Sequence, residues 1–257
     1  MRFIRYQTRS EPARYGWLYD DKVGPLDGSP FGEYRRHEAE LPLANVRLLA
    51  PVLPGKILCV GRNYAEHAKE HNAEVPDVPL IFMKPSTAVI GPEQTILLPP
   101  QSQQVEHEAE LVVVIGKLGR WIAPEDASQY ILGYTIGNDI TARDLQRRDG
   151  QWTRGKGFDT FCPLGPWIET ELNPADLMIT CHVNGEMRQM GSTREMVFQI
   201  PQLIAFCSSI MTLEPGDLLM TGTPAGVSPL REGDIVEVAI ESLGTLRNPV
   251  GTDTTHP

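Results

Sequence analysis

Acidic side chains interrupt an apolar stretch of the sequence at residues 105–115. The second half of this stretch, Leu-Val-Val-Val-Ile, is typical of a strand buried on both faces. Alternation along the first half places Glu106, Glu108 and Glu110 on one face of that strand. Neighbouring carboxylates in a partly dry site repel one another, and either a raised pKa or a bound metal relieves the repulsion. A solvated strand end is the alternative interpretation.

Another acid, Asp139, interrupts a β-like stretch at residues 134–140. A turn that ends a strand is one interpretation, because Asn138 and Asp139 are turn formers. If Asp139 instead meets Glu108 and Glu110, the three carboxylates form an all-oxygen site. Hard oxygen ligands select Mg²⁺ or Mn²⁺, and such sites normally keep positions open for water and substrate.

A histidine and a glutamate lie three residues apart on a short helix that we expect to begin at Asn63. Asn63 would cap this helix, and Glu66 would complete a capping box. Spacing of three places His67 and Glu70 on the same face, where a His–Glu pair can orient and deprotonate a water molecule. The alternative is a charged surface helix that also includes His71.

Polar and basic residues follow Asp139 closely. Arg143, Gln146 and Lys156 are suited to hold a small organic anion near a metal, although each could be ordinary exposed charge. Residues 150–156 also match G-x-x-x-x-G-K, the start of a phosphate-binding loop. Position 157 is glycine rather than the Ser or Thr that the loop requires, so we do not expect a nucleotide site.

The elements that must position these residues are mostly strands. The chain has 23 Gly and 22 Pro, which divide short apolar runs at close intervals, as in a sandwich, roll or barrel. Asn184-Gly185 predicts a hairpin within residues 178–189, and residues 234–240 read as a further strand. Helices are expected only at residues 63 onward, 124–131 and 201–211. We therefore predict a mainly β (α+β) fold with a small N-terminal β domain at residues 1–54 and a main domain at residues 55–257.

The composition excludes several classes of function. With 23 basic and 33 acidic residues the formal net charge is −10, which argues against duplex nucleic acid as a partner. The longest unbroken aliphatic run, residues 111–115, is far shorter than the roughly 20 residues that cross a bilayer, so no membrane span is expected. The four cysteines are scattered and read as small core side chains in a reducing compartment. The expected location is the cytoplasm.

Seven short motifs, in order, resemble the fumarylacetoacetate hydrolase family over about residues 56 to 250. They are Gly61-Arg62-Asn63-Tyr64 with His67, Met83-Lys84-Pro85-Ser86-Thr87, His107-Glu108-x-Glu110-Leu111, Asp139-x-Thr141-Ala142-Arg143-Asp144, Lys156-x-Phe158-Asp159, Val183-Asn184-Gly185-Glu186, and Leu219-x-Thr221-Gly222-Thr223-Pro224-x-Gly226-Val227. Each motif is weak alone, and their order makes the resemblance specific.

The resemblance implies a mixed β-sandwich roll, a homodimer and a role for each site residue. The metal ligands for one Mg²⁺ or Mn²⁺ would be Glu108, Glu110 and Asp139. The catalytic residues would be His67 and Glu70, which activate water, and Lys156, which supports an enolate. The substrate-binding residues would be Arg143, Gln146, Thr223, which meets the substrate carboxylate, and Arg62, which begins the segment expected to set selectivity.

One departure from the family narrows the expected chemistry. Larger members supply a further Asp just upstream of the catalytic His, whereas residues 58–64 contain no acid. The sequence thus resembles the branch of acylpyruvate hydrolases, oxaloacetate decarboxylases and isomerases of unsaturated dicarboxylic acids. We expect C–C cleavage of short β-dicarbonyl acids through a metal-stabilised enolate, with a small 2-oxo acid as substrate. The alternatives are an isomerase or decarboxylase of 2-hydroxyhepta-2,4-diene-1,7-dioate and a non-catalytic binding protein.

Overall fold

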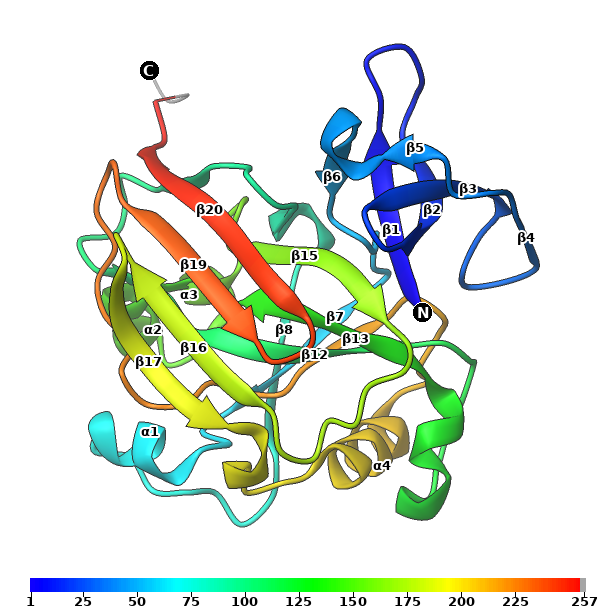
Figure 1. The fold of residues 1–257 in the computed structure, drawn as a ribbon. Helices are drawn as coiled ribbons and strands as arrows, with labels where there is room; N and C mark the ends of the chain where they lie inside the picture. Colours follow the sequence, from blue (N-terminus) through cyan, green and yellow to red (C-terminus); the bar gives the residue numbers. More distant parts are fainter. Residues whose placement is uncertain (255–257) are drawn as a thin grey trace.

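The computed structural model describes residues 1–254, which form a mainly β protein with few helices (Figure 1). A long curled sheet runs in the order β4-β3-β2-β1-β15-β13-β12-β18-β7-β8. Its strands are β1 (Arg2–Gln7), β2 (Arg14–Tyr19), β3 (Lys22–Gly28), β4 (Tyr34–Arg36), β7 (Ile57–Gly61), β8 (Leu80–Lys84), β12 (Ala109–Ile115), β13 (Ile131–Asn138), β15 (Cys162–Glu169) and β18 (Leu218–Met220). Three short strands pair with members of this sheet: β5 (Leu41–Pro42) with β3, β6 (Arg47–Leu49) with β1, and β9 (Val89–Ile90) with β15.

A second sheet lies over the central strands and has the order β10-β20-β19-β16-β17 (Figure 1). Its members are β10 (Ile96–Leu98), β16 (Met178–Val183), β17 (Glu186–Ser192), β19 (Ile235–Ile240) and β20 (Gly244–Thr252). The predicted hairpin is confirmed, since β16 and β17 pair across Asn184 and Gly185, whose φ angles are 53° and 79°. Positive φ at both positions is what a type I′ turn requires.

The helices are short and lie at the edges of the sheets. The α-helices are α1 (Ala65–Glu70), α2 (Arg143–Asp149), α3 (Thr153–Lys156) and α4 (Ile200–Ile210), and 3₁₀ turns span Leu43–Asn45, Ser86–Ala88, Pro124–Tyr130 and Thr193–Glu195. The helices expected at residues 124–131 and 201–211 are thus present, the first as a 3₁₀ helix. The helices at residues 143–149 and 153–156 were missed. Within residues 1–254, no helix has the length and apolar character needed to span a bilayer.

Strand β12 is buried on both faces, as its sequence predicts. Leu111, Val113 and Ile115 pack into the core beneath the second sheet, and Val112 and Val114 pack into a separate core with strands of the long sheet. Burial of these side chains stabilises the strand at about 25 cal/mol per Å² of apolar surface removed from water. The acids at the start of the strand are buried in the same way, so their ionised forms lose hydration and are destabilised unless a cation or hydrogen bonds compensate.

Two local predictions were wrong. Residues 105–115 do not form one strand, because Val105–Glu106 (β11) pairs with Thr141–Ala142 (β14) in a separate ladder and β12 begins only at Ala109. Asn63 does not cap α1, whose N-cap is Tyr64 with no side-chain hydrogen bond. The Asn63 amide is used instead to tie distant loops together.

The N-terminal strands extend the long sheet, since β1 pairs with β15 (Figure 1). A division between residues 54 and 55 stays a prediction.

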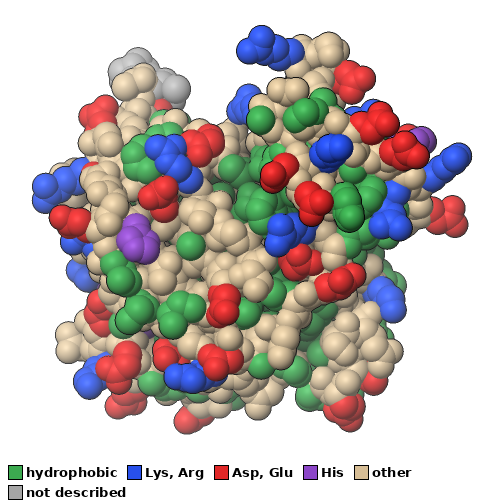
Figure 2. Space-filling model, viewed as in Figure 1, with side chains coloured by type: hydrophobic (Ala, Val, Ile, Leu, Met, Phe, Trp, Pro, Cys, Tyr) green, Lys and Arg blue, Asp and Glu red, His purple; other side chains and the backbone are tan. Residues whose placement is uncertain are grey.

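Acidic and basic side chains are interspersed over the face in Figure 2, and hydrophobic side chains gather beside the N-terminal strands. The four cysteines are buried and free, so the prediction that they are core side chains is confirmed.

Candidate active site

The register between β12 and β13 brings the three predicted metal ligands together. Glu110 lies opposite Gly137, and the Asp139 backbone N–H donates to the Glu108 carbonyl at 2.8 Å. One carboxylate oxygen from each of Glu108, Glu110 and Asp139 lies within 4.8 Å of the others. All three side chains are buried, so an acid cluster is enclosed at one end of a buried strand pair.

Two lysines neutralise part of this cluster. Lys156 Nζ donates to Glu108 Oε2 at 2.7 Å and to Asp139 Oδ2 at 2.6 Å. Lys84 Nζ donates to Asp139 Oδ1 at 2.6 Å. Sequence reasoning gave Lys84 no role, although a lysine that ends the apolar strand Leu80–Lys84 is an identifiable signal.

Glu110 is the acid of the cluster whose negative charge is least balanced by nearby cations and hydrogen bonds. Its Oε2 accepts a hydrogen bond from the Gly222 N–H at 2.8 Å, and no cationic side chain among residues 1–254 pairs with it. Burial, with the nearby charges of Asp139 and Glu108, raises the pKa of Glu110 well above its ordinary value. Burial alone would raise the pKa of Glu108 too, but the charges of Lys156 and Arg143 more than offset this and lower it.

The donor set fits a hard divalent cation. With Glu106 included, four carboxylates face three cations, Lys84, Lys156 and Arg143, so a net negative charge remains. The raised pKa of Glu110 expresses that imbalance. A donor set made only of carboxylate oxygens suits Mg²⁺, Mn²⁺ and Ca²⁺ better than zinc or copper, which favour nitrogen or sulfur ligands. Glu108, Glu110 and Asp139 are therefore suited to hold such an ion.

Glu106 belongs to a different arrangement. Arg143 Nε donates to Glu106 Oε2 at 2.7 Å, and Arg143 Nη2 donates to Glu108 Oε1. Gln146, one turn along α2, accepts from Arg143 Nη1 at 2.7 Å. Arg143 and Gln146 are thus brought together, and Arg143 links Glu106 to the acid cluster as a buried guanidinium whose three nitrogens each donate one hydrogen bond.

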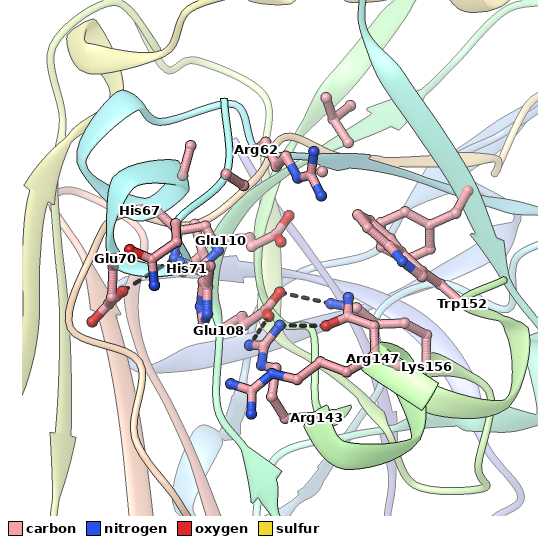
Figure 3. A pocket seen from close by; sticks show the side chains of 18 of the residues that line it. Arg62, His67, Glu70, His71, Glu108, Glu110, Arg143, Arg147, Trp152 and Lys156 are labelled. Atoms are coloured by element: carbon pink, nitrogen blue, oxygen red, sulfur yellow. Dashed lines mark hydrogen bonds and ion pairs between the residues drawn. The ribbon is translucent and has the colours of Figure 1, made fainter. Parts of the chain in front are cut away.

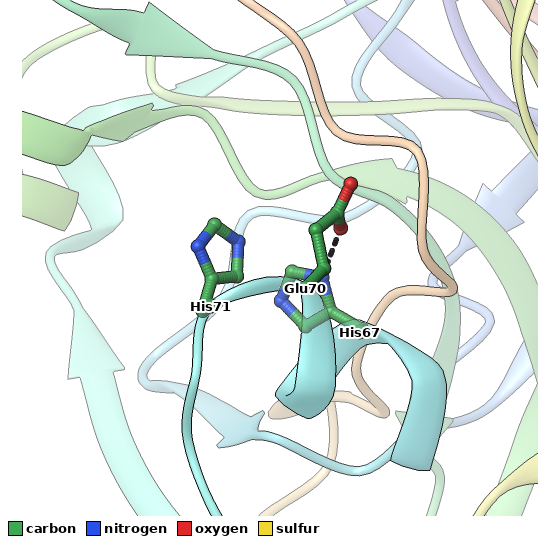
Figure 4. A group of neighbouring side chains, drawn as sticks. All are labelled: His67, Glu70 and His71. Carbon is green, nitrogen blue, oxygen red and sulfur yellow. Dashed lines mark hydrogen bonds and ion pairs between the residues drawn. The ribbon is translucent and has the colours of Figure 1, made fainter.

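The predicted His67–Glu70 pair is present on α1. His67 Nδ1 lies 3.3 Å from Glu70 Oε2, and the Gly226 N–H donates to the Glu70 carboxylate at 3.2 Å (Figure 4). Burial lowers the pKa of His67 to about 4, partly offset by Glu108, so the ring is neutral near pH 7. Burial raises the pKa of Glu70. A neutral imidazole oriented by a carboxylate can accept a proton.

A cavity of about 620 Å³ joins the pair to the acid cluster (Figure 3). The predicted residues on its wall are Arg62, His67, Glu70, Glu108, Glu110, Arg143, Gln146, Lys156 and Thr223; Asp139 lies behind them. His71, Arg147 and Trp152 also line it and were not predicted. The sequence offered a signal for two of these residues: His71 lies four positions after His67, and Arg147 lies four positions after Arg143.

Buried amides position the loops around the cavity. Asn63 Nδ2 donates to the carbonyls of Thr221 at 2.8 Å and Phe198 at 3.1 Å, and the Phe198 N–H donates back to Asn63 Oδ1. Gln189 Nε2 donates to Thr223 Oγ1 at 2.7 Å. Thr221 and Thr223 are therefore anchored from two sides, which holds the turn at Gly222 against Glu110.

Comparison with known proteins agrees with this fold and identifies a family. Residues 56–251 match the family model described as fumarylacetoacetate (FAA) hydrolase C-terminal, and residues 1–51 match a model described as Rv2993c-like, N-terminal. The chain is 51% identical over 224 residues to protein Rv2993c of Mycobacterium tuberculosis, covering 86% of this chain and 84% of that protein.

Two further relatives have names that state a reaction. Oxaloacetate tautomerase Fahd2a, mitochondrial, of Rattus norvegicus is 48% identical over 227 residues, covering 82% of this chain and 72% of that protein. The crystal structure of 2-hydroxyhepta-2,4-diene-1,7-dioate isomerase from Mycobacterium marinum has a TM-score of 0.92 and 42% identity, covering 99% of this chain and 100% of that chain. The class so defined is a family of enzymes that act on small acids. This chain belongs to the fumarylacetoacetate hydrolase family.

Proposed function

We propose that the protein is a Mg²⁺- or Mn²⁺-dependent enzyme that forms the enolate of a short 2-oxo acid. The observation that carries this proposal is the cluster of Glu108, Glu110 and Asp139 at the base of a cavity whose wall holds the His67–Glu70 pair. A divalent cation held by the three acids would supply a Lewis acid that polarises the keto oxygen and stabilises the developing negative charge.

The proton is moved by the His67–Glu70 pair. With Nδ1 donating to Glu70, the lone pair of His67 lies on Nε2, which accepts a proton from the carbon next to the ketone. Because burial lowers the pKa of His67 to about 4, the ring is unprotonated at neutral pH, and the Glu70 carboxylate would stabilise the imidazolium formed when it takes the proton. Gly226 holds the Glu70 carboxylate and so fixes the direction of the imidazole.

Cationic side chains attract and orient the anionic substrate. Lys156 and Arg143 place their charges beside Glu108, and with a divalent cation held by the acids the local charge would be positive and would attract a 2-oxo acid although the whole chain is acidic. Lys156 lines the cavity while it donates to Glu108 and Asp139, so its ammonium lies where it would stabilise negative charge on a substrate bound beside these acids.

Proton transfer at the carbon next to the ketone is the reaction that we propose first. Two relatives named for tautomerisation and isomerisation support it, since both reactions remove and return a proton. C–C cleavage of acylpyruvates or decarboxylation of oxaloacetate is the second candidate, because both generate a pyruvate enolate. The cavity, at about 620 Å³, has room for a water molecule beside His67 and a short acid.

The experiment measures three reactions on one preparation, with Mg²⁺ and with chelator: oxaloacetate keto–enol exchange by ultraviolet absorbance, pyruvate release from oxaloacetate, and pyruvate release from acetylpyruvate. We expect Mg²⁺-dependent exchange that is lost in His67→Asn and retained in Lys69→Met, an exposed control on the same helix. Release of pyruvate faster than exchange would favour cleavage. No acceleration of any of the three with Mg²⁺ or Mn²⁺ would support the non-catalytic binding role. The homodimer and the cytoplasmic location stay predictions.

A further inference from the structure

The two helices beside the cavity each carry a pair of residues four positions apart. On α1 and its C-cap these are His67 and His71, and on α2 they are Arg143 and Arg147; all four line the cavity. Residues at this spacing lie on one helix face, roughly 5–6 Å apart. His67 and Arg143 are 6% and 4% exposed, whereas His71 is half-buried and Arg147 is exposed. Each helix therefore presents an inner residue at the acid cluster and an outer residue nearer the opening.

The inner residues have partners, and the outer residues do not. Arg143 is bonded to Glu106, Glu108 and Gln146. Arg147 has no hydrogen bond or ion pair with any residue in the described part of the chain. Its guanidinium extends toward the His71 side of the cavity (Figure 3).

His71 also has an unused polar atom. Its Nε2 is buried without a hydrogen-bond partner. Glu70 is bonded to His67 and not to His71 (Figure 4), although the two imidazole rings are only 4.7 Å apart. A buried polar atom without a partner costs free energy, and a ligand that satisfies it recovers that cost.

We propose that Arg147 and His71 form a subsite for a terminal carboxylate of the substrate, one helical turn outward from the reacting centre. This rests on the proposed function and assigns two selectivity residues of the same site, which would favour 2-oxo acids with a second carboxylate several carbons beyond the ketone. The second carboxylate of oxaloacetate is attached to the carbon next to the ketone, so it remains near the inner residues. A neutral acyl chain would leave the guanidinium and the imidazole without partners.

Arg62 is the competing position for such a carboxylate. It lines the cavity, has no hydrogen bond or ion pair with the residues described, and has a φ of +57°, which is uncommon for a side-chain-bearing residue. Arg62 lies on the Trp152 side of the cavity in Figure 3. The Arg147 guanidinium lies on the His71 side of the cavity (Figure 3), where the unpartnered Nε2 of His71 offers a second polar group, and this favours Arg147.

The test compares two ligands that differ only at the far end, 2-oxoheptanedioate and 2-oxoheptanoate. Calorimetric titration into the Mg²⁺-loaded full chain gives the ratio of their Kd values without requiring turnover. We expect the dioate to bind about tenfold more tightly to the wild type, the value of one charge-assisted hydrogen-bonded contact. In R147M the ratio should fall to within about twofold of one, and H71N should reduce it in the same direction.

R148M is the matched control. Arg148 is the next residue on α2 and does not line the cavity, and its Nε lies 3.7 Å from Asp149 Oδ1. This variant should therefore keep the wild-type ratio of the two Kd values. An unchanged ratio in R147M, or loss of the ratio in R62M alone, overturns the inference while the proposed function stands. Binding of neither ligand in the presence of Mg²⁺ or Mn²⁺ overturns the inference alone, whereas the proposed function is overturned only if no Mg²⁺- or Mn²⁺-dependent reaction of oxaloacetate or acetylpyruvate is found. Circular dichroism of each variant identifies loss of folding.

Discussion

Lys84 Nζ lies 2.6 Å from Asp139 Oδ1, and both side chains are almost completely enclosed. Lys84 comes from the end of β8, and Asp139 directly follows β13. Asp139 therefore has a cation on each side, since Lys156 bonds its other oxygen. With Arg143 and Glu106 counted, three cations face four acids. Glu110, which has no cationic partner among residues 1–254, is where a divalent ion would supply the missing positive charge.

Loss of the Lys84 charge should destabilise the fold. Lys84→Met removes one partner of a buried ion pair, and we expect a loss of about 3–5 kcal/mol in the free energy of unfolding measured with urea and chelator. Saturating Mg²⁺ should recover part of this loss, because the ion replaces the missing charge. Lys69→Met, at an exposed pair with Glu66, should change the value by less than about 0.5 kcal/mol. Equal losses in the two variants would contradict the role given to Lys84.

Replacement of Glu110 should separate metal binding from folding. Glu110→Gln removes a carboxylate whose pKa is raised by burial and by its acidic neighbours, so stability in chelator should stay equal or increase. The wild type should gain about 2.7 kcal/mol when Mg²⁺ is present at 100 times its Kd, and the variant should gain almost nothing. Glu125→Gln, an exposed acid elsewhere, should respond like the wild type. A full Mg²⁺ response in Glu110→Gln would remove Glu110 from the ligand set.

The pH dependence of stability should report on His67. The unfolded chain takes up this proton near pH 6.5 and the folded chain only near pH 4, so the unfolded state binds more protons between these values. The stabilisation is complete above pH 6.5 and is lost as the pH falls, by about 2 kcal/mol at pH 5. Unfolding free energies at pH 7.5 and 5.0 should therefore differ less in His67→Asn than in the wild type. An identical difference in the two proteins would show that His67 titrates normally.

Gly61 should control the shape of the cavity. A Cβ atom at this position would lie 2.6 Å from Trp152 Cζ3, so Gly61→Ala must displace the indole that lines the cavity. We expect a loss of about 1–3 kcal/mol in stability and a rise of about tenfold in KM for the 2-oxo acid. A Cβ atom at Gly32 would meet nothing within 4 Å, so Gly32→Ala should leave both quantities near their wild-type values. Unchanged KM in Gly61→Ala would mean that Trp152 does not shape the binding site.

Several features were determined by local sequence. The buried strand at 111–115 and the hairpin at Asn184-Gly185 follow from side-chain alternation, β-branching and turn geometry, which are properties of adjacent residues. His67 and Glu70 meet because a helix brings positions three apart onto one face. The meeting of Glu108, Glu110 and Asp139 was predicted as one of two alternatives, and the structure brings the three together.

Other features were decided only by the tertiary structure. Glu106 leaves the strand of Glu110 and pairs with Arg143, Asn63 bonds to residues 135 and 158 positions away, and Lys84 reaches Asp139 across 55 positions. These contacts depend on strand order and register, which no short stretch of sequence specifies. Local patterns place a charged side chain on a face of its element, but its partner, and so its protonation, is set by which distant elements pack against that face.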